Sequence, residues 1–216
     1  MGSNLATNVF RSVPVLIEHL ECRRMLAAGD FDTTFNGNGR VINNSSPGAV
    51  NDLAMAADGG IYAATGTDHM VVYKYKSNGA LDTTWGAPST PGRVADIALN
   101  TTLDHYGAIS MAVQNDGKLF VAAGMYLFQN GVGPITIARY TTAGLLDPSW
   151  SGTGTAQVPA PPASTFHVSS IALQADGKLV VVADTETQIF VARLTTTGSL
   201  DTTFDGDGEK IFSLPD

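Results

Sequence analysis

Residues 171–182 read IALQADGKLVVV, and this stretch decides the expected fold of the chain. An Asp-Gly pair, Asp176-Gly177, stands between two apolar runs that favour β-strands. Such a pair is the strongest short-range hairpin signal, because a type I′ turn needs positive φ at both central residues and Asp and Gly tolerate it best. The stretch therefore predicts an antiparallel β-hairpin with positive φ at Gly177.

The same arrangement occurs at two earlier places in the chain. Residues 111–122 read MAVQNDGKLFVA, and residues 53–62 read LAMAADGGIY. The aspartate of the pair therefore stands at positions 58, 116 and 176, at intervals of 58 and 60 residues. A period of this length with several short strands per unit is typical of β-propeller blades.

A basic residue and an aspartate follow each hairpin, always eight residues apart. The three pairs are Lys74 with Asp82, Arg139 with Asp147, and Arg193 with Asp201. We expect each of these aspartates to cap a turn through backbone N–H groups, and each basic residue to pair with it across strands. Because the pair is present in every unit, a structural role is favoured over a functional one.

An aromatic residue ends each of these aspartate turns, and an extra copy of the turn, residues 31–35 (FDTTF), precedes the first hairpin. The four aromatic residues are Phe35, Trp85, Trp150 and Phe204. They could line a sugar-binding surface, but their fixed position in the repeat favours packing between neighbouring blades.

A further β-prone piece follows each aspartate turn, at residues 40–42, 93–95, 156–158 and 210–212. Strands such as residues 179–182 are apolar on both faces, and such strands must be covered on both sides. The prediction is an all-β fold: a β-propeller-like array of about three four-stranded antiparallel blades in an incomplete ring.

The repeat domain is expected to span residues 29–216, with units at about 29–86, 87–151 and 152–216. Propellers typically use four to eight blades, so three blades do not close a ring of usual size. The end blades would leave uncovered an apolar face of the kind that Val180 and Val182 present, and residues 210–212 look like the opening strand of a further unit. We therefore expect further blades, from the same gene product or from a second chain.

The repeated pattern, hydrophobic–Gln–x–Asp-Gly-Lys, then Ala-Arg-Tyr, then Gly-x-Leu-Asp-x-x-Phe, resembles the delta-60 repeat of bacterial surface and exported β-propeller proteins. The resemblance covers residues 29–216. This sequence departs from the family pattern at Gly60, Trp85, Trp150 and Asp184. The resemblance implies a propeller fold and export, and it implies no established reaction.

Residues 1–28 form a separate leader without the β repeat. Pro14 suits a first helical position, an i, i+3, i+4, i+7 apolar spacing follows from Val13 to Leu20, and Gly29 would end the helix. A signal peptide is not indicated, because only six residues separate Arg11 from Glu18 and an apolar core of about 7–15 is needed.

Residues 20–26 (LECRRML) resemble the LEPR-XLL segment found near the N-terminus of large exported bacterial proteins. Cys22 replaces its proline, and Met25 replaces its first leucine. The resemblance implies an exported, extracellular or cell-surface protein. The alternative is an amphipathic leader without an addressing role.

Composition excludes several classes of protein. The formal net charge of −8 argues against a nucleic-acid surface, which needs a basic patch. A single cysteine, Cys22, cannot form an intrachain disulfide. No apolar run is long and uninterrupted enough to predict a transmembrane helix.

The sequence contains no catalytic or cofactor-binding motif, and the four histidines, His19, His69, His105 and His167, fall at unrelated positions in the repeat. One weak calcium candidate exists, the alternating carboxylates Asp205, Asp207 and Glu209, although a plain glycine turn is favoured there. We expect no catalytic residue and no resident cofactor or metal.

The favoured function is a non-enzymatic exported or cell-surface module that acts as a scaffold or binding surface for a protein or glycan. The alternative is a propeller enzyme, a hydrolase or lyase, whose active site cannot be recognised from the sequence.

Overall fold

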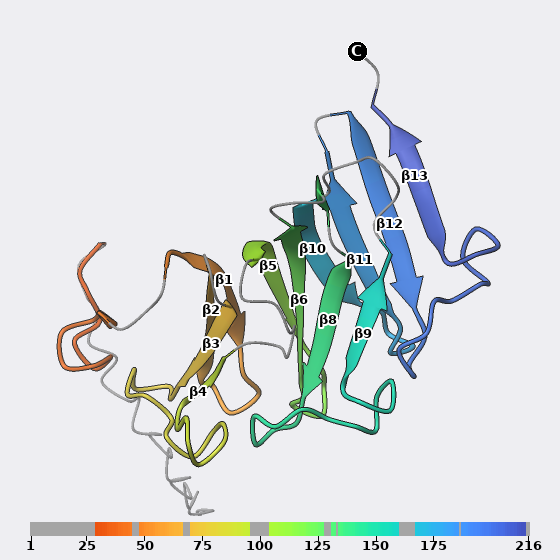
Figure 1. The fold of residues 1–216 in the computed structure, drawn as a ribbon. Coiled ribbons are helices and arrows are strands. Elements are labelled where there is room, and N and C mark those ends of the chain that lie inside the picture. Colours follow the sequence, from red (N-terminus) through yellow and green to blue (C-terminus); the bar gives the residue numbers. More distant parts are fainter. Residues whose placement is uncertain are drawn as a thin grey trace, which may run out of the picture.

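The structure is a computed structural model that describes residues 29–44, 48–66, 70–95, 104–127, 131–132, 134–159, 167–185 and 187–214. Its strands form three antiparallel sheets that lie side by side (Figure 1). The predicted leader helix, like all of residues 1–28, lies outside the described residues. No helix in the described part of the chain could cross a membrane.

Each sheet is a meander in which every strand pairs with the next one along the chain. The first sheet consists of β1 (Val50–Met55), β2 (Ile61–Gly66), β3 (Met70–Tyr75) and β4 (Arg93–Ala95). The second consists of β5 (Asp104–Val113), β6 (Leu119–Leu127), β8 (Ile135–Tyr140) and β9 (Thr155–Val158), and the short β7 (Gly131–Val132) pairs with β6. The third consists of β10 (His167–Leu173), β11 (Leu179–Asp184), β12 (Gln188–Leu194) and β13 (Glu209–Ser213).

The predicted fold class is confirmed: the chain is an all-β, propeller-like array of three blades that does not close into a ring. The expectation that residues 210–212 open a further unit is wrong. They lie in β13, where Lys210 pairs with Val191 and Phe212 with Ile189. The expected unit boundaries, 86/87 and 151/152, fall between the third and fourth strands of the first and second sheets.

The Asp-Gly hairpins form as expected, but their turn type differs from the prediction. Gly117 and Gly177 have φ values of 85° and 81°, whereas the preceding aspartates are not among the residues with positive φ. The Gly117 N–H donates to the Gln114 carbonyl, and the Gln114 N–H donates to the Lys118 carbonyl. This is a longer loop that ends in a left-handed glycine, so the glycine alone provides the positive φ.

The hydrophobic core consists of two layers, one between each pair of neighbouring sheets. Tyr62, Met70 and Val72 of the first sheet pack against Leu119 and Val121 of the second. The opposite face of the second sheet packs against the third through a layer that contains the residues Phe120, Ile135, Ile137, Val158, Leu179, Val181 and Phe190. Alternate residues of β6 thus serve opposite layers, as expected for a blade covered on both faces.

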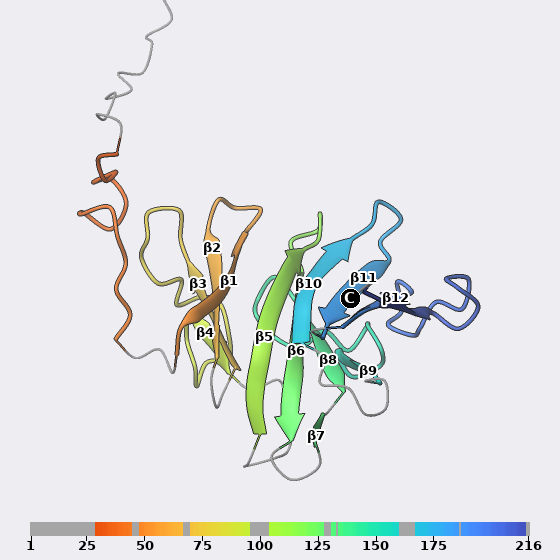
Figure 2. The same cartoon turned by 90° about the horizontal axis from the view of Figure 1, so that it is seen from above.

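The first strands of the sheets, β1, β5 and β10, lie next to one another, and the later strands fan outward from them (Figure 2). Two contacts join these inner strands. The Asp52 carboxylate accepts the Met111 N–H at 2.6 Å, and the Ser110 hydroxyl accepts the Ile171 N–H at 3.2 Å. Each sheet is therefore tied to the next at its inner edge.

Candidate functional site

The recurring aspartates are the centres of buried charge clusters. In the second sheet, Asp147 lies 2.9 Å from the Arg139 guanidinium and 3.1 Å from Lys118 Nζ. Its other carboxylate oxygen accepts the backbone N–H and the hydroxyl of Ser149. The predicted turn cap and cross-strand pair are thus confirmed in one residue.

The third sheet repeats this cluster. Asp201 lies 2.7 Å from Arg193 and 3.0 Å from Lys178, and it accepts the N–H and the hydroxyl of Thr203. The recurring lysine of the Asp-Gly-Lys stretch therefore joins the hairpin to the aspartate turn that follows it.

In the first sheet Gly60 occupies the position of that lysine, and Lys74 takes over both contacts. Its ammonium lies 2.7 Å from Asp58 and 3.2 Å from Asp82. The same two segments are thus joined by one cation where the other sheets use two.

These contacts lower the pKa of the aspartates. Burial raises the pKa of Asp147, but hydrogen bonds from Ser149 and Lys118 and the charge of Arg139 outweigh it and bring the value to about 2. Hydrogen bonds from Thr203 and Lys178 hold the pKa of Asp201 below its ordinary value. A carboxylate stabilised in its charged form in this way is a poor general acid or base near neutral pH, so the clusters have the character of structural ties.

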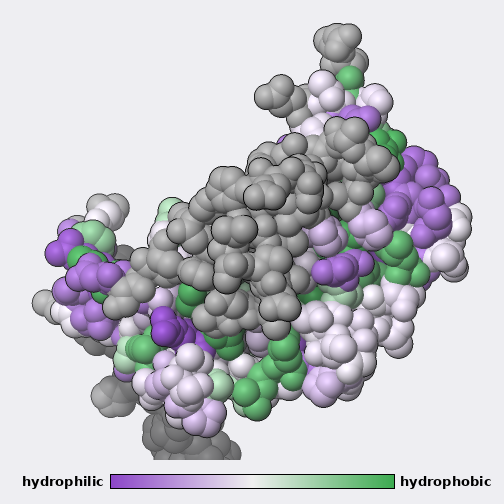
Figure 3. All heavy atoms as spheres, viewed as in Figure 1, coloured by the Kyte–Doolittle hydropathy of each residue, from purple (hydrophilic) through white to green (hydrophobic). Residues whose placement is uncertain are grey.

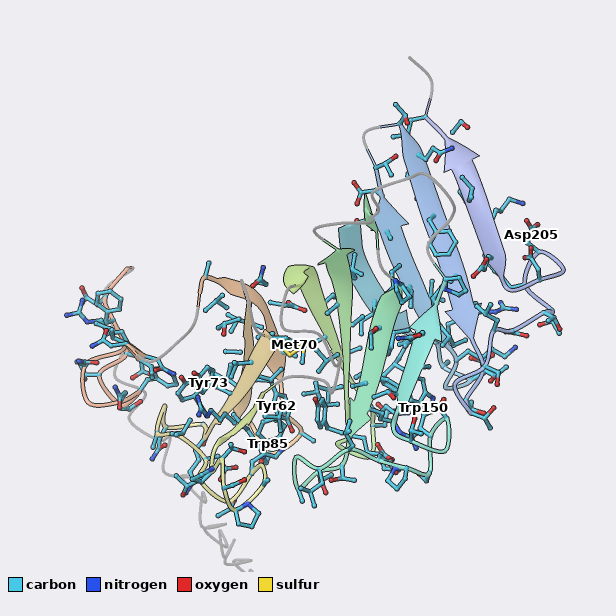
Figure 4. The ribbon with its side chains drawn as sticks, in the orientation of Figure 1. Tyr62, Met70, Tyr73, Trp85, Trp150 and Asp205 are labelled. Atoms are coloured by element: carbon cyan, nitrogen blue, oxygen red, sulfur yellow. The ribbon has the colours of Figure 1, made fainter. Side chains whose placement is uncertain are left out.

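Two of the four turn aromatics, Trp85 and Trp150, pack between sheets, as their fixed position in the repeat predicts. Trp85 and Trp150 are each 1% exposed. The Trp85 ring centre lies 5.4 Å from that of Tyr62 (Figure 4). The Trp150 ring centre lies 5.1 Å from that of Phe120. With their rings buried, these two tryptophans do not form a sugar-binding platform.

Each of these two rings contacts a glycine of the next unit, and a backbone hydrogen bond to the same unit accompanies it. We call this ring contact and this hydrogen bond together the latch. The residue after the aromatic donates its N–H to a carbonyl in the next unit, and the ring lies against the glycine that follows this carbonyl. The N–H bonds run from Gly86 to Ala143 at 2.9 Å and from Ser151 to Thr197 at 3.0 Å. The rings of Trp85 and Trp150 lie against Gly144 and Gly198.

The extra turn before the first hairpin makes the same latch. Asn36 donates its N–H to the Asn78 carbonyl at 2.7 Å, and the Phe35 ring lies against Gly79. We call the turn that contains the accepting carbonyl and this glycine the acceptor turn. Its glycine recurs in the sequence, but the contact with the aromatic ring was not predicted. The fixed place of this glycine shortly before each aspartate turn was the signal that could have revealed it.

A groove of about 590 Å³ lies between the Asp-Gly loops of the second and third sheets. Both sides contribute the same repeat positions, including Gln114 and Gln174, beside Asn115 and Asp116. Among the described residues, the buried Oε1 of Gln114 has no hydrogen-bond partner. In the sequence these glutamines stand out only as repeat positions, and their pattern does not predict a groove.

The calcium candidate lies in the exposed loop before β13, where Figure 3 shows hydrophilic residues gathered at the right-hand edge. Asp205 pairs with Lys210 Nζ at 2.8 Å, and Asp207 accepts the Glu209 N–H. Burial and the charge of Asp207 raise the pKa of Glu209. In the described part of the chain no group of three or more His, Cys, Asp or Glu residues is placed to hold a metal ion.

The structure does not describe the side chain of any of the four histidines. His19 and His69 lie outside the described residues, and for His105 and His167 the structure describes the backbone in β5 and β10 but not the side chains. The hypothesis that they are surface or loop residues therefore remains a prediction.

Comparison with known proteins agrees with this architecture. A family model described as "Domain of unknown function (DUF5122) beta-propeller" matches residues 114–149 and 174–204. Both segments run from an Asp-Gly loop to the end of an aspartate turn, in the second and third units. A search of curated proteins gives no match.

Solved structures similar to the chain include a protein of unknown function from Bacteroides caccae, with 13% identity and a TM-score of 0.46. That match covers 74% of this chain and 46% of the other. Another is a structure described as the Dos1 propeller, with 13% identity and a TM-score of 0.43, covering 80% of this chain and 39% of the other. The chain thus spans less than half the length of either. With its three stacked sheets and the family-model match to two of its units, it has the fold of an incomplete β-propeller.

Proposed function

We propose that the chain is a non-enzymatic binding module whose loop face contacts a protein or glycan. The observation that carries this proposal is the groove between the Asp-Gly loops of the second and third sheets. Its walls offer amide groups from Gln114, Asn115 and Gln174, and the buried Gln114 Oε1 is free to accept a hydrogen bond. A buried acceptor without a partner costs free energy, which a ligand N–H or O–H would recover once the Gln114 amide turns toward the groove.

The charge clusters support a binding role over a catalytic one. They repeat in all three sheets and hold their aspartates in the charged form. An enzyme would be expected to break the repeat by placing unlike polar groups together on one rim, whereas here the units stay alike.

We further propose that the module acts outside the cell or on its surface. The support is the similarity of residues 20–26 to the LEPR-XLL segment and of the repeat to exported propellers. Antibody labelling of intact producing cells tests this placement. Signal on unpermeabilised cells or in the medium is expected, and signal only after lysis would contradict the proposal.

The binding role is tested by screening the purified chain against a glycan array and against proteins of the producing cell's surface. The double variant Q114A/Q174A should lose the ligand that the wild type retains. Q157A, which removes the same amide from the exposed face of β9, is the matched control and should retain it. Equal binding by Q114A/Q174A and the wild type would place the binding surface elsewhere.

A further inference from the structure

The turn that makes the latch occurs four times in the described residues. Three copies make both contacts, and the fourth, at Phe204 and Asp205, has no acceptor among these residues. In every copy the residue after the aromatic has a left-handed backbone: Asn36, Gly86, Ser151 and Asp205 have φ values of 50°, 95°, 55° and 51°. For the first three, the N–H donates to the next unit. Among the described residues, no carbonyl of another unit accepts from the Asp205 N–H.

The backbone at Asp205 already has the left-handed conformation of the three residues that donate a latch hydrogen bond. A non-glycine residue at positive φ is strained and persists only where its surroundings impose it. At Asp205 the turn itself does so: the Phe204 N–H donates to the Asp201 carbonyl, and the Gly208 N–H donates to the Phe204 carbonyl. The Phe204 side chain is half-buried, and Cζ of the Arg193 guanidinium lies 5.0 Å from the centre of its ring.

The sheet face beside this latch repeats a face that is covered elsewhere in the molecule. Phe120 pairs with Arg139 in the second sheet, and Val180 pairs with Arg193 in the third, so the two positions are equivalent. On the second sheet this face is fully buried against the third, through residues that include Phe120, Ala122, Ile135, Ile137 and Val158. The equivalent residues of the third sheet are half-buried or exposed: Val180, Val182, Ile189, Val191 and Phe212.

We propose that this face of the third sheet, together with Phe204 and Asp205, docks a further repeat unit of the same type. The unit would present a glycine turn like residues 76–80, with its carbonyl accepting the Asp205 N–H and its glycine against the Phe204 ring. This docking would continue the existing array, because the equivalent surface and latch already form the interfaces between the first and second sheets and between the second and third.

The partner is a unit whose glycine turn is free, and an unaltered second copy of this chain does not provide one. Among the described residues, the three acceptor carbonyls, those of Asn78, Ala143 and Thr197, already accept a latch N–H. At the first of them the donor is Asn36, from the segment 29–44 that lies outside the sheets. Phe35 and Val41 of this segment line a cavity of about 390 Å³ on the first sheet, beside Leu53, Ile61 and Tyr73.

Releasing that segment converts a copy of the chain into the required partner, and this provides the test. In the full-length variant F35D/V41D, both apolar anchors of residues 29–44 are replaced, and the Asn78–Gly79 turn becomes free. In sedimentation velocity, the wild-type chain should show no association that depends on Phe204. F35D/V41D chains should associate head to tail, increasingly with concentration.

Adding F204D to the double variant removes the donor ring, and the triple variant should return to the wild-type sedimentation coefficient. F31D alters an exposed aromatic residue of the same segment, 63% exposed, and should sediment as the wild type does. Circular dichroism confirms that each variant keeps its sheets. F35A and F204A serve as milder replacements where a variant fails this check.

Two outcomes would overturn the proposal: F35D/V41D chains that stay monomeric at every concentration, and association that persists in the triple variant. Wild-type association that F204D abolishes would still place the docking at Phe204, and it would show that the Asn78 carbonyl of the wild-type chain is open to a second chain.

Discussion

Gly144 lies so close to Trp85 that it has no room for a side chain. A Cβ atom placed on Gly144 would lie 2.8 Å from two atoms of the indole ring and 2.5 Å from the backbone nitrogen of Gly86. That nitrogen is the latch donor to the neighbouring Ala143 carbonyl. One glycine therefore lets the ring and the hydrogen bond of the latch form together.

Gly144→Ala should accordingly destabilise the fold through the interface between the first two sheets. Gly152→Ala is the matched control, because its φ of 74° is close to the 79° of Gly144 while nothing lies within 4 Å of its added Cβ. We expect Gly152→Ala to cost about 1 kcal/mol from backbone strain, and Gly144→Ala to cost about 2 kcal/mol more from the clash. Urea denaturation measures both, and equal losses would show that the latch contact contributes nothing.

Replacing Gly60 with lysine, the residue that the other two units have at this position, should destabilise the fold. A Cβ on Gly60 would lie 2.5 Å from the Tyr75 carbonyl oxygen and 2.9 Å from the Asp58 carboxylate. Both Gly60→Lys and Gly60→Ala should therefore lower the free energy of unfolding, by about 1–3 kcal/mol. A stabilised Gly60→Lys variant in thermal unfolding would show that the repeat pattern, and not the local backbone, determines this position.

Stability should depend on pH through Asp147. Its pKa is about 2 in the folded chain, below the ordinary 3.8, so its stabilisation is complete above about pH 4. This stabilisation is lost as the pH falls from 4 to 2, because the unfolded chain binds the proton first. Urea denaturation between pH 2 and 7 should show a smaller acid loss for Asp147→Asn than for the wild type.

Ser149→Ala removes one of the two Ser149 hydrogen bonds to that carboxylate and keeps the ion pairs, so it should give an intermediate acid profile. Identical profiles for the wild type and Asp147→Asn would contradict this role of the cluster.

The sequence could predict the blades because their signals are local. The Asp-Gly loops, the eight-residue spacing and the turn aspartates each act within a few residues of themselves. The turn type was wrong because the propensity of Asp and Gly for positive φ does not reveal that the Gln114 N–H bonds to the Lys118 carbonyl. The placement of residues 210–212 was wrong because a β-prone piece between two units pairs equally well, by pattern, with either.

The candidate site was less accessible to sequence reasoning because it depends on contacts between units. The position of Gln114 beside Gln174 follows from how two sheets pack. In the same way, Gly79 looks like an ordinary turn glycine until Phe35 and Asn36 are seen to lie against it. By contrast, the charge pair could be predicted because its two members belong to one unit.

The central claim is that the described sheets form an open array in which the outer face of the third sheet is uncovered. It is tested most directly by binding of a dye for apolar surface, measured with light scattering on the same sample. We predict that the monomeric chain binds the dye, and that the double variant V182T/I189T, altered on that face, binds less. A stable monomer that binds no dye would contradict the account and would mean that the three sheets cover their apolar faces in a closed arrangement.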